Sequence, residues 1–276
     1  MRTQHFKIVL ILFMTTFWAT SAFSIERLVI PGTGDSQKLL REAARYFERE
    51  HPEVIIDIPE SVGSVGGIKR VLNGHTPLAR IARPLDANER ASGLASTVFA
   101  YTPVVFVANL PEKCVDNLSE AELVAIYSGE ITSWQKLGNC PDHKIYVANR
   151  EEGDSSRILI EANLPDFKKI PKLAGKIIYS TPETLHIIED HSYTIGYLPL
   201  AMLRSSPLTR FAINNLHPTV ENIVTNSYPL AVPLGFVWKD ELTGSYRQFV
   251  EFLFSPKGQE IIRSHDAVPS PKTPGT

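Results

Sequence analysis

The sequence predicts an α/β protein in two lobes, and three features lead to this expectation. From position 27 onward, short apolar runs alternate with amphipathic stretches, which is the pattern of strands and helices in α/β domains. Turns rich in glycine and serine join several of these runs to the stretch that follows. Once an N-terminal segment is set aside, about 250 residues remain, enough for one large core or two smaller ones.

That N-terminal segment has the pattern of a secretory signal peptide. Two basic residues precede an apolar run over residues 8–18, and Ala22 and Ser24 form a small-x-small cleavage site. The run is short for a membrane span. The mature chain is expected to start near Ile25, where no cysteine is present to carry a lipid. We therefore expect an exported, periplasmic protein without a lipid anchor.

The first part of the mature chain contains two strand, turn and helix units. A strand over residues 27–30 leads through the turn 32–36 into a helix with apolar residues at helical spacing. A second strand over 54–58 leads through the turn 63–67 into a short helix. The longest strand-like run follows at 99–110.

The middle of the chain adds a third such unit. A capping box of Ser119 and Glu122 starts a helix that ends before Gly129. The strand over 144–147 then leads through the polar turn 150–156 into another helix, which completes the third unit.

The last part of the chain is expected to form one helix, two strands and a final long helix. Thr181 as N-cap and Pro182 at the first helical position open a helix. Strands are expected over 193–198 and 228–238, and a single helix over 246–263.

The three polar turns suggest an anion site. A helix N-terminus presents unpaired backbone N–H groups and about half a positive charge, so it binds oxyanions without a basic side chain. Serine adds a hydroxyl donor, and glycine lets the backbone approach closely. Ordinary helix capping is the alternative for each turn alone, but three turns that converge would surround one tetrahedral anion.

The same residues carry a resemblance to a known family. In order along the chain, the segments GTGDS (32–36), GSVGGIK (63–69), ARPL (82–85), IYSG (126–129), ITSW (131–134), REEGDSSR (150–157), IGY (195–197), YPL (228–230) and FLFSPKGQ (252–259) resemble motifs of the phosphate-binding proteins of bacterial ABC transporters. The resemblance implies a type II periplasmic-binding-protein fold, with two mixed sheets flanked by helices and a hinge between the lobes. Residues 25–101 and 228–276 would form lobe 1, and residues 102–227 would form lobe 2.

The resemblance also implies a ligand set. The residues that match the family's phosphate contacts are Asp35, Ser36, Ser64, Arg150, Asp154, Ser155 and Ser156. Arg83 is a further candidate, with a solvated loop arginine as the alternative. Arg150 is expected to supply a charge-assisted bond to the anion, unless it pairs with Glu151 or Glu152 instead. Arg157 either faces the ligand, lies at the helix surface or pairs with Asp154.

The sequence departs from the family pattern at Ala82. Many members carry an aspartate there, which accepts the proton that phosphate has and sulfate lacks. Either Asp35 or Asp154 is expected to replace that acceptor, or both serve only as helix N-terminal residues. An ionised carboxylate with no proton to accept would repel the anion.

The two cysteines, Cys114 and Cys140, are expected to form a disulfide, because thiols of exported proteins are oxidised. Two unpaired cysteines are the alternative.

The composition and motifs exclude several functions. A formal net charge of −2 gives no basic surface for nucleic acid. Val62 stands where a nucleophile elbow needs glycine, and His186 with His191 does not form a metal motif, so no enzyme, metal or cofactor is expected. We expect a monomer that binds inorganic phosphate or a similar oxyanion and delivers it to an ABC transporter permease. A membrane sensor as partner, or sulfate or molybdate as ligand, are the alternatives.

Overall fold

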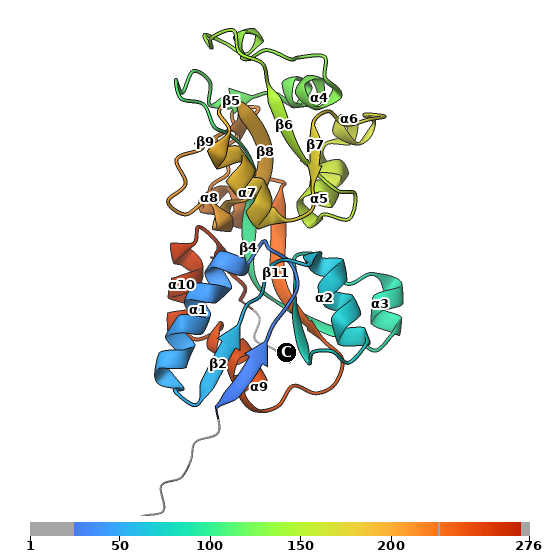
Figure 1. Ribbon diagram of the computed structural model, residues 1–276, viewed down its shortest axis with the longest axis vertical. Coiled ribbons are helices and arrows are strands. Elements are labelled where there is room, and N and C mark those ends of the chain that lie inside the picture. The colour runs from blue at the N-terminus through green and yellow to red at the C-terminus, as the bar shows by residue number, and fades with distance from the viewer. Residues whose placement is uncertain (1–24, 226, 272–276) are drawn as a thin grey trace, which may run out of the picture.

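The structure is a computed structural model that describes residues 25–225 and 227–271. It has two α/β bodies, one above the other in Figure 1 and joined by two long strands. The α/β class expected from the sequence is confirmed. The expected signal peptide lies outside the described residues.

The lower body is built around strands from both ends of the chain. It contains β1 (Glu26–Val29), α1 (Gln37–Glu50), β2 (Val54–Asp57), α2 (Gly63–Leu72), β3 (Leu78–Ile81), α3 (Ala87–Ala91), α9 (Gly244–Phe252), α10 (Pro256–Ser264) and β12 (Val268–Pro269). β1 and β2 pair in parallel, and a parallel bridge from Gly32 to Arg80 connects them to β3. The α1 face that carries Leu39, Ala43 and Phe47 is buried in the core.

The upper body comes from the middle of the chain. It contains β5 (Asn117–Leu118), α4 (Glu120–Ser128), η1 (Trp134–Lys136), β6 (Tyr146–Arg150), α5 (Ser155–Asn163), α6 (Pro165–Lys168), β7 (Lys176–Ile178), α7 (Thr181–Asp190), β8 (Thr194–Pro199), η2 (Leu200–Met202), β9 (Thr209–Arg210), β10 (Ala212–Ile213) and α8 (Val220–Val224). β6 pairs in parallel with both β7 and β8. The expected capping box is present, since Ser119 and Glu122 exchange hydrogen bonds and Gly129 ends α4 at φ 85°.

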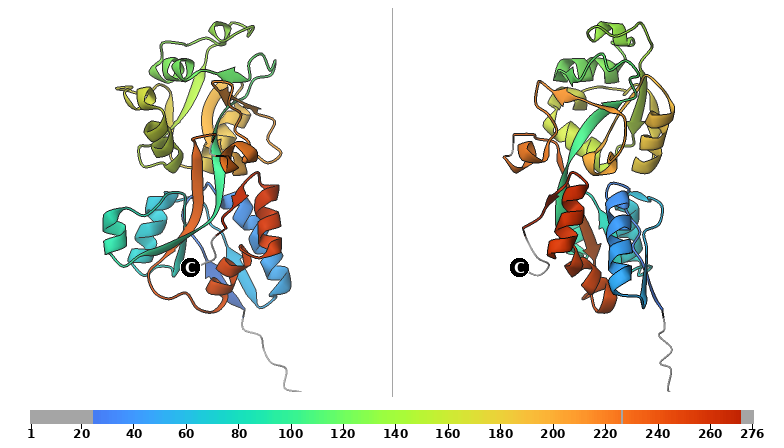
Figure 2. Two further views of the ribbon diagram at one scale, coloured as in Figure 1. Left: turned by 180° about the vertical axis from the view of Figure 1, so that it is seen from behind. Right: turned by 90° about the vertical axis from the view of Figure 1, so that its left-hand side faces the viewer.

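Two strands, β4 (Ala95–Ala108) and β11 (Ala231–Trp238), connect the bodies. Residues 95–103 of β4 pair with β11, and residues 104–108 pair with β8 of the upper body. The strand order is β3-β11-β4-β8-β6-β7, so one path of hydrogen bonds runs from one body to the other. Both views in Figure 2 show β4 passing from the lower body into the upper one.

The polar turns end up at the boundary between the bodies. The N-terminal ends of α1 and α2 point up from the lower body, and those of α5 and α7 point down from the upper body (Figure 1). Each follows a strand, so the turn between strand and helix lies at this boundary.

The C-terminal helix differs from the sequence prediction. The expected single helix over 246–263 is wrong, because the structure has two helices, α9 and α10, in its place. Pro256 lacks the N–H that a continuing helix needs. Ser255 instead caps a new helix by accepting a hydrogen bond from the N–H of Gly258 at 3.1 Å.

Candidate functional site

Two of the polar turns touch across the boundary between the bodies. Ser64, in the first turn of α2, lies 3.2 Å from Ser155 in the first turn of α5, hydroxyl to hydroxyl. The Ser64 hydroxyl also accepts a hydrogen bond from the N–H of Ala82 at 3.0 Å. Both serines are buried, so the turns form a closed contact rather than two facing surfaces with solvent between them.

A second link crosses the boundary through Thr181 at the start of α7. Its hydroxyl donates to Asp35 Oδ1 of the lower body at 2.5 Å and accepts from Arg150 Nη1 of the upper body at 3.0 Å. One hydroxyl thereby connects a carboxylate and a guanidinium from opposite bodies. Asp35 is 1% exposed and Arg150 is 3% exposed, so this chain of hydrogen bonds is shielded from water.

Arg150, at the end of β6, is fixed by several partners. Its Nε donates to the carbonyl of Ile178 at 3.0 Å, and its Nη2 lies 2.8 Å from Asp154 Oδ2. Asp154 caps α5 by accepting from the N–H of Arg157 at 3.0 Å. The pairing of Arg150 with Glu151, which was the alternative reading of this arginine, is looser, at 3.9 Å. The guanidinium is therefore held in one orientation at the boundary.

Three polar side-chain atoms near these contacts have no partner. Asp35 Oδ2, Ser36 Oγ and Ser156 Oγ are buried, and none makes a hydrogen bond within the described part of the chain. Buried polar groups are nearly always satisfied, so unsatisfied ones in a cluster indicate that a ligand supplies the missing bonds. Two hydroxyls and a carboxylate oxygen next to a buried guanidinium suit an oxyanion that also carries a proton.

The electrostatics of the site are dominated by two buried carboxylates. Burial and the nearby charge of Asp154 raise the pKa of Asp35 to about 6. Burial likewise raises the pKa of Asp154 above its usual value, although Arg150 opposes this rise. Both shifts mean that the ionised form of each of these two carboxyl groups is disfavoured where the bodies meet.

The backbone of the first turn depends on close approach between elements. Gly32 has φ 136°, and a Cβ there would lie 2.1 Å from the carbonyl oxygen of Arg80. A Cβ at Gly67 of α2 would lie 2.9 Å from the Cα of Gly32. Glycine at both positions lets the turn that carries Asp35 and Ser36 pack directly against α2 and β3.

Arg83 is engaged elsewhere. Its guanidinium donates two hydrogen bonds to Glu89, at 2.8 and 2.7 Å, and one to the carbonyl of Pro84 at 3.0 Å. The structure therefore does not join Arg83 to the hydrogen bonds around Arg150. The sequence left the role of Arg157 open. In the structure Arg157 donates to Glu161 at 2.7 Å and to the carbonyl of Arg150 at 3.0 Å, so it supports the polar turn 150–156 from the side.

Comparisons with known proteins agree with this geometry. The family model of the PBP superfamily domain matches residues 19–257. The phosphate-binding protein PstS of Borreliella burgdorferi is 30% identical over 213 residues, which cover 74% of this chain and 76% of that protein. The chain belongs to the PstS family.

Further relatives of the PstS family extend the likeness. PstS of Bacillus subtilis is 27% identical over 237 residues, covering 85% of this chain and 77% of that protein. A solved substrate-binding protein from Clostridium perfringens, assigned to a phosphate ABC transporter and holding bound phosphate, has a TM-score of 0.78 at 25% identity. It covers 89% of this chain and 100% of its own. The relatives are binding proteins rather than enzymes, as expected from the sequence.

Thr181 is a site residue that the sequence prediction misplaced. The N-cap of α7 is Ser180, whose hydroxyl accepts from the N–H of Glu183 at 3.3 Å, and not Thr181 as expected. Capping by Ser180 leaves the Thr181 hydroxyl available to bridge Asp35 and Arg150. The sequence did contain a signal for this N-cap, because Ser180 directly precedes Thr181 and Pro182. Either hydroxyl residue suits an N-cap, and proline is tolerated anywhere in the first turn.

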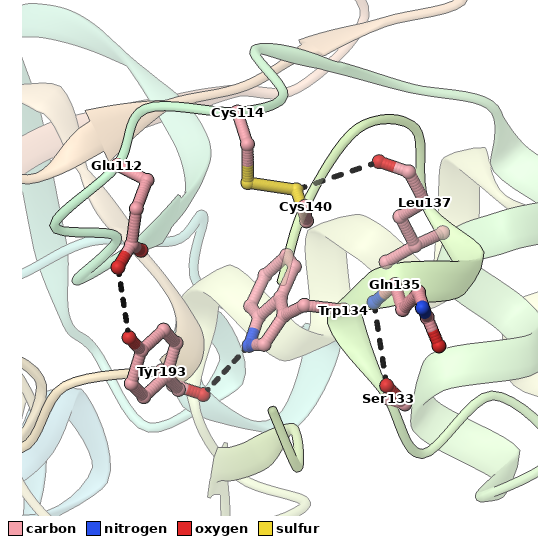
Figure 3. The surroundings of a disulfide bond; sticks show 8 residues. All are labelled: Glu112, Cys114, Ser133, Trp134, Gln135, Leu137, Cys140 and Tyr193. Atoms are coloured by element: carbon pink, nitrogen blue, oxygen red, sulfur yellow. Dashed lines mark hydrogen bonds between the residues drawn. A yellow bond between two sulfur atoms is a disulfide. The ribbon is translucent and has the colours of Figure 1, made fainter. Parts of the chain in front are cut away.

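Cys114 and Cys140 form the expected disulfide, with their Cα atoms 4.9 Å apart. It lies beside Trp134 (Figure 3), in the loops at the upper end of the upper body (Figure 1). The Trp134 indole N–H donates to the carbonyl of Tyr193 at 3.0 Å, and the Tyr193 hydroxyl donates to Glu112 at 3.1 Å. The disulfide therefore stabilises the top of the upper body and takes no part in the site.

Proposed function

We propose that the protein captures inorganic phosphate between its two lobes and presents it to an ABC transporter permease. The observation that carries the proposal is the set of buried, unpartnered oxygens of Asp35, Ser36 and Ser156 around the fixed guanidinium of Arg150. Membership of the PstS family and the phosphate-bound structure with the same fold support it.

The proposed contacts combine side chains with helix N-termini. Ser36, Ser64, Ser155 and Ser156 supply hydroxyl groups, and α1, α2 and α5 begin at or beside these serines. Some of their first N–H groups already have partners, since that of Gln37 donates to the carbonyl of Gly34 at 3.0 Å and that of Arg157 donates to Asp154 at 3.0 Å. We propose that the anion accepts from other N–H groups of these first turns. Arg150 supplies the positive charge, and Asp154 orients it. We place Arg83 outside the contact set, because Glu89 occupies its guanidinium.

We propose that the lobes are residues 25–101 with 228–276, and residues 102–227, and that they open about β4 and β11. The contacts of Ser64 with Ser155 and of Asp35 with Thr181 both cross this division. They would have to break for phosphate to enter. Under this proposal, the described structure is the closed arrangement.

We further propose that residues 1–24 direct export, that no lipid anchor is attached, and that the mature chain acts as a monomer. No helix among the described residues is long and apolar enough to cross a membrane. N-terminal sequencing and mass measurement of the exported protein test the cleavage site near Ile25, and sedimentation tests the monomer.

Calorimetry of the mature protein against phosphate tests the central proposal. Bound ligand is first removed by unfolding, dialysis and refolding. The wild type is expected to bind, and Arg150→Gln is expected to weaken binding by about a hundredfold or more, because a buried charge partner is lost. Arg83→Gln serves as the matched control and should bind within about threefold of wild type.

Two outcomes would overturn parts of the proposal. Absence of phosphate binding by folded wild-type protein would overturn the ligand. Phosphate binding combined with cross-linking to a membrane sensor, and not to a permease, would keep the ligand and overturn the partner.

A further inference from the structure

We infer that the groove between α1 and α10 is a docking surface for an extended acidic segment of a partner protein. The inference goes beyond phosphate capture and does not depend on it. The two helices lie side by side on the lower body (Figure 2), and the groove has a volume of about 420 Å³. Its lining includes four cations and two carboxylates, which are Arg45, Arg49, Arg204, Lys257, Glu42 and Glu260. A chain with a formal net charge of −2 therefore has a local excess of positive charge here.

Both carboxylates of the groove already have a cationic partner. Glu42 pairs with the arginine that follows η2 at 2.7 Å, and Glu260 pairs with the lysine of α10 at 2.8 Å. The two remaining cations, Arg45 and Arg49 of α1, are exposed, and neither forms an ion pair within the described part of the chain. These two charges are therefore available to a partner.

Tyr46 holds cations from both walls of the groove close together. Its half-buried ring stacks on Phe252, with the ring centroids 5.7 Å apart. Arg49 Cζ of α1 lies 4.9 Å from the centroid of the Tyr46 ring, and Lys257 Nζ of α10 lies 5.1 Å from it. The face of an aromatic ring attracts a cation but leaves its charge in place. The ring thus orders two positive groups without neutralising them.

These two positive groups also repel each other. The hydrogen bond with Glu260 raises the pKa of Lys257, and the charge of Arg49 opposes that rise. Like charges that are held near one another interact unfavourably, and a carboxylate placed between them would turn the repulsion into two attractive contacts. The groove is therefore electrostatically complementary to an anionic partner.

The spacing of the cations fits an extended chain. Arg45 and Arg49 are four residues apart on one helix, so they lie about 6 Å apart along its axis. Arg204 binds Glu42, almost one turn earlier, which gives a cationic row about 10 Å long. In an extended peptide, every second side chain points to the same side, at a repeat of about 7 Å. Acidic residues at alternate positions would therefore meet successive cations of the row.

The groove differs from the anion site between the bodies in the exposure of its polar groups. The buried polar atoms that lack a partner in the described chain include those of Ser36 and Ser156, but none of them lines this groove. Nothing in the groove is thus arranged to enclose one small ion. Exposed, long cationic side chains attract an acidic surface over an area instead, which favours a segment with several carboxylates.

Fluorescence anisotropy with a labelled peptide of about eight residues, in which glutamate and serine alternate, tests the inference on the full mature protein. A peptide with glutamine in place of glutamate is the matched control. The acidic peptide is expected to bind wild type at least about tenfold more tightly than the neutral one. Its affinity should fall as the salt concentration rises from about 0.05 to about 0.5 M, because exposed charges are screened.

Two double variants locate the binding surface. Arg45→Gln with Arg49→Gln is expected to lower the affinity for the acidic peptide at least about tenfold and to leave the affinity for phosphate as in wild type. Lys69→Gln with Arg70→Gln removes the same net charge at exposed positions of α2 that do not line the groove. This control should bind the acidic peptide within about threefold of wild type.

Several outcomes would overturn the inference. Folded wild type that binds the acidic and the neutral peptide equally would show that the groove has no acidic partner, even where a double variant does not fold. Equal losses in both double variants would show attraction to net charge alone. If the Arg45 and Arg49 pair is needed instead for binding inorganic pyrophosphate, or for sedimentation with phosphatidylglycerol vesicles, the occupant is a small anion or a membrane. None of these outcomes affects phosphate capture, which calorimetry tests separately.

Discussion

At the residue scale, the site contains two buried carboxyl groups whose burial lowers the stability of the fold. Asp35 and Asp154 are both buried, and burial is the largest cause of the raised pKa of each. A buried carboxylate with an unpartnered oxygen lowers the stability of the empty closed form. Such local costs are typical of binding sites, where the ligand completes the missing interactions.

Replacing Asp35 with asparagine is expected to stabilise the ligand-free protein at neutral and higher pH. The pKa of Asp35 is raised from 3.8 to about 6, so the folded state holds its proton more tightly than the unfolded chain does. The free energy of unfolding therefore falls as pH rises through this window, and the stability lost above it is about 1 to 3 kcal/mol.

Urea unfolding of wild type and Asp35→Asn across this pH range measures the difference. The variant should be more stable at about pH 8, and the two curves should converge below about pH 4. A variant that is less stable at high pH would mean that the Asp35 carboxylate is well compensated in the ligand-free protein.

For single residues, the sequence pointed to the polar turns but not to the hydrogen-bond partners of their side chains. The turns that carry Ser36, Ser64 and Arg150 were found because hydroxyl, glycine and arginine residues after strands have a direct chemical meaning. Thr181 was misplaced because its role depends on a contact with Asp35, 146 positions away in the chain. Propensity cannot distinguish two adjacent hydroxyl residues that both suit an N-cap.

At the element scale, local sequence signals such as capping residues predicted most element boundaries. The main error lies at Pro256, where the predicted single helix is divided in two. The α4 helix begins at its capping box and ends at Gly129 as expected. The apolar spacing continues past Pro256 and therefore predicts one continuous C-terminal helix. In the structure a second helix, α10, begins at Pro256 with Ser255 as its N-cap. The apolar pattern gives the face of a helix, but proline decides where it stops.

Removing the disulfide is expected to destabilise the upper body without weakening ligand binding. The two cysteines are separated by 26 positions. Loop-closure entropy for a loop of that length corresponds to about 3 kcal/mol. The double variant Cys114→Ser with Cys140→Ser should therefore melt at a lower temperature.

Calorimetry with phosphate at a temperature where the double variant is folded provides the second readout. Affinity within about threefold of wild type is expected, because the disulfide lies beside Trp134 in the loops at the upper end of the upper body, whereas the polar turns lie at its lower end. A large loss of affinity in the folded variant would show that the top of the upper body is coupled to the site.

At the scale of the whole molecule, two strands carry the connection between the bodies. β4 pairs with β11 over its first part and with β8 over its last part. The sequence predicted the long strand-like run but not which strands pair with its two ends, because the pairing partners lie more than eighty positions away along the chain. Under the proposed opening, bending of β4 and β11 would change the separation of the two bodies.

Saturating phosphate is expected to stabilise and compact the protein. At about 100 times the dissociation constant, a ligand that binds only the folded state adds about 2.7 kcal/mol. For a chain of this size that corresponds to a rise in Tm of about 5 to 10 °C. Small-angle scattering should show a smaller radius of gyration with phosphate than without it, and an unchanged radius would contradict opening and closing.

The hydroxyl contact between Ser64 and Ser155 has a practical consequence. The hydroxyl oxygens of Ser64 and Ser155 come from opposite bodies and lie 3.2 Å apart. A covalent bond between these two positions could therefore replace the hydroxyl contact. Cysteines at both positions should oxidise readily in the closed form, since their Cβ atoms need to be only about 4 Å apart. Under the proposed function, oxidation after phosphate has bound would hold the anion between the bodies until a reducing agent is added, so that its release could be triggered at will.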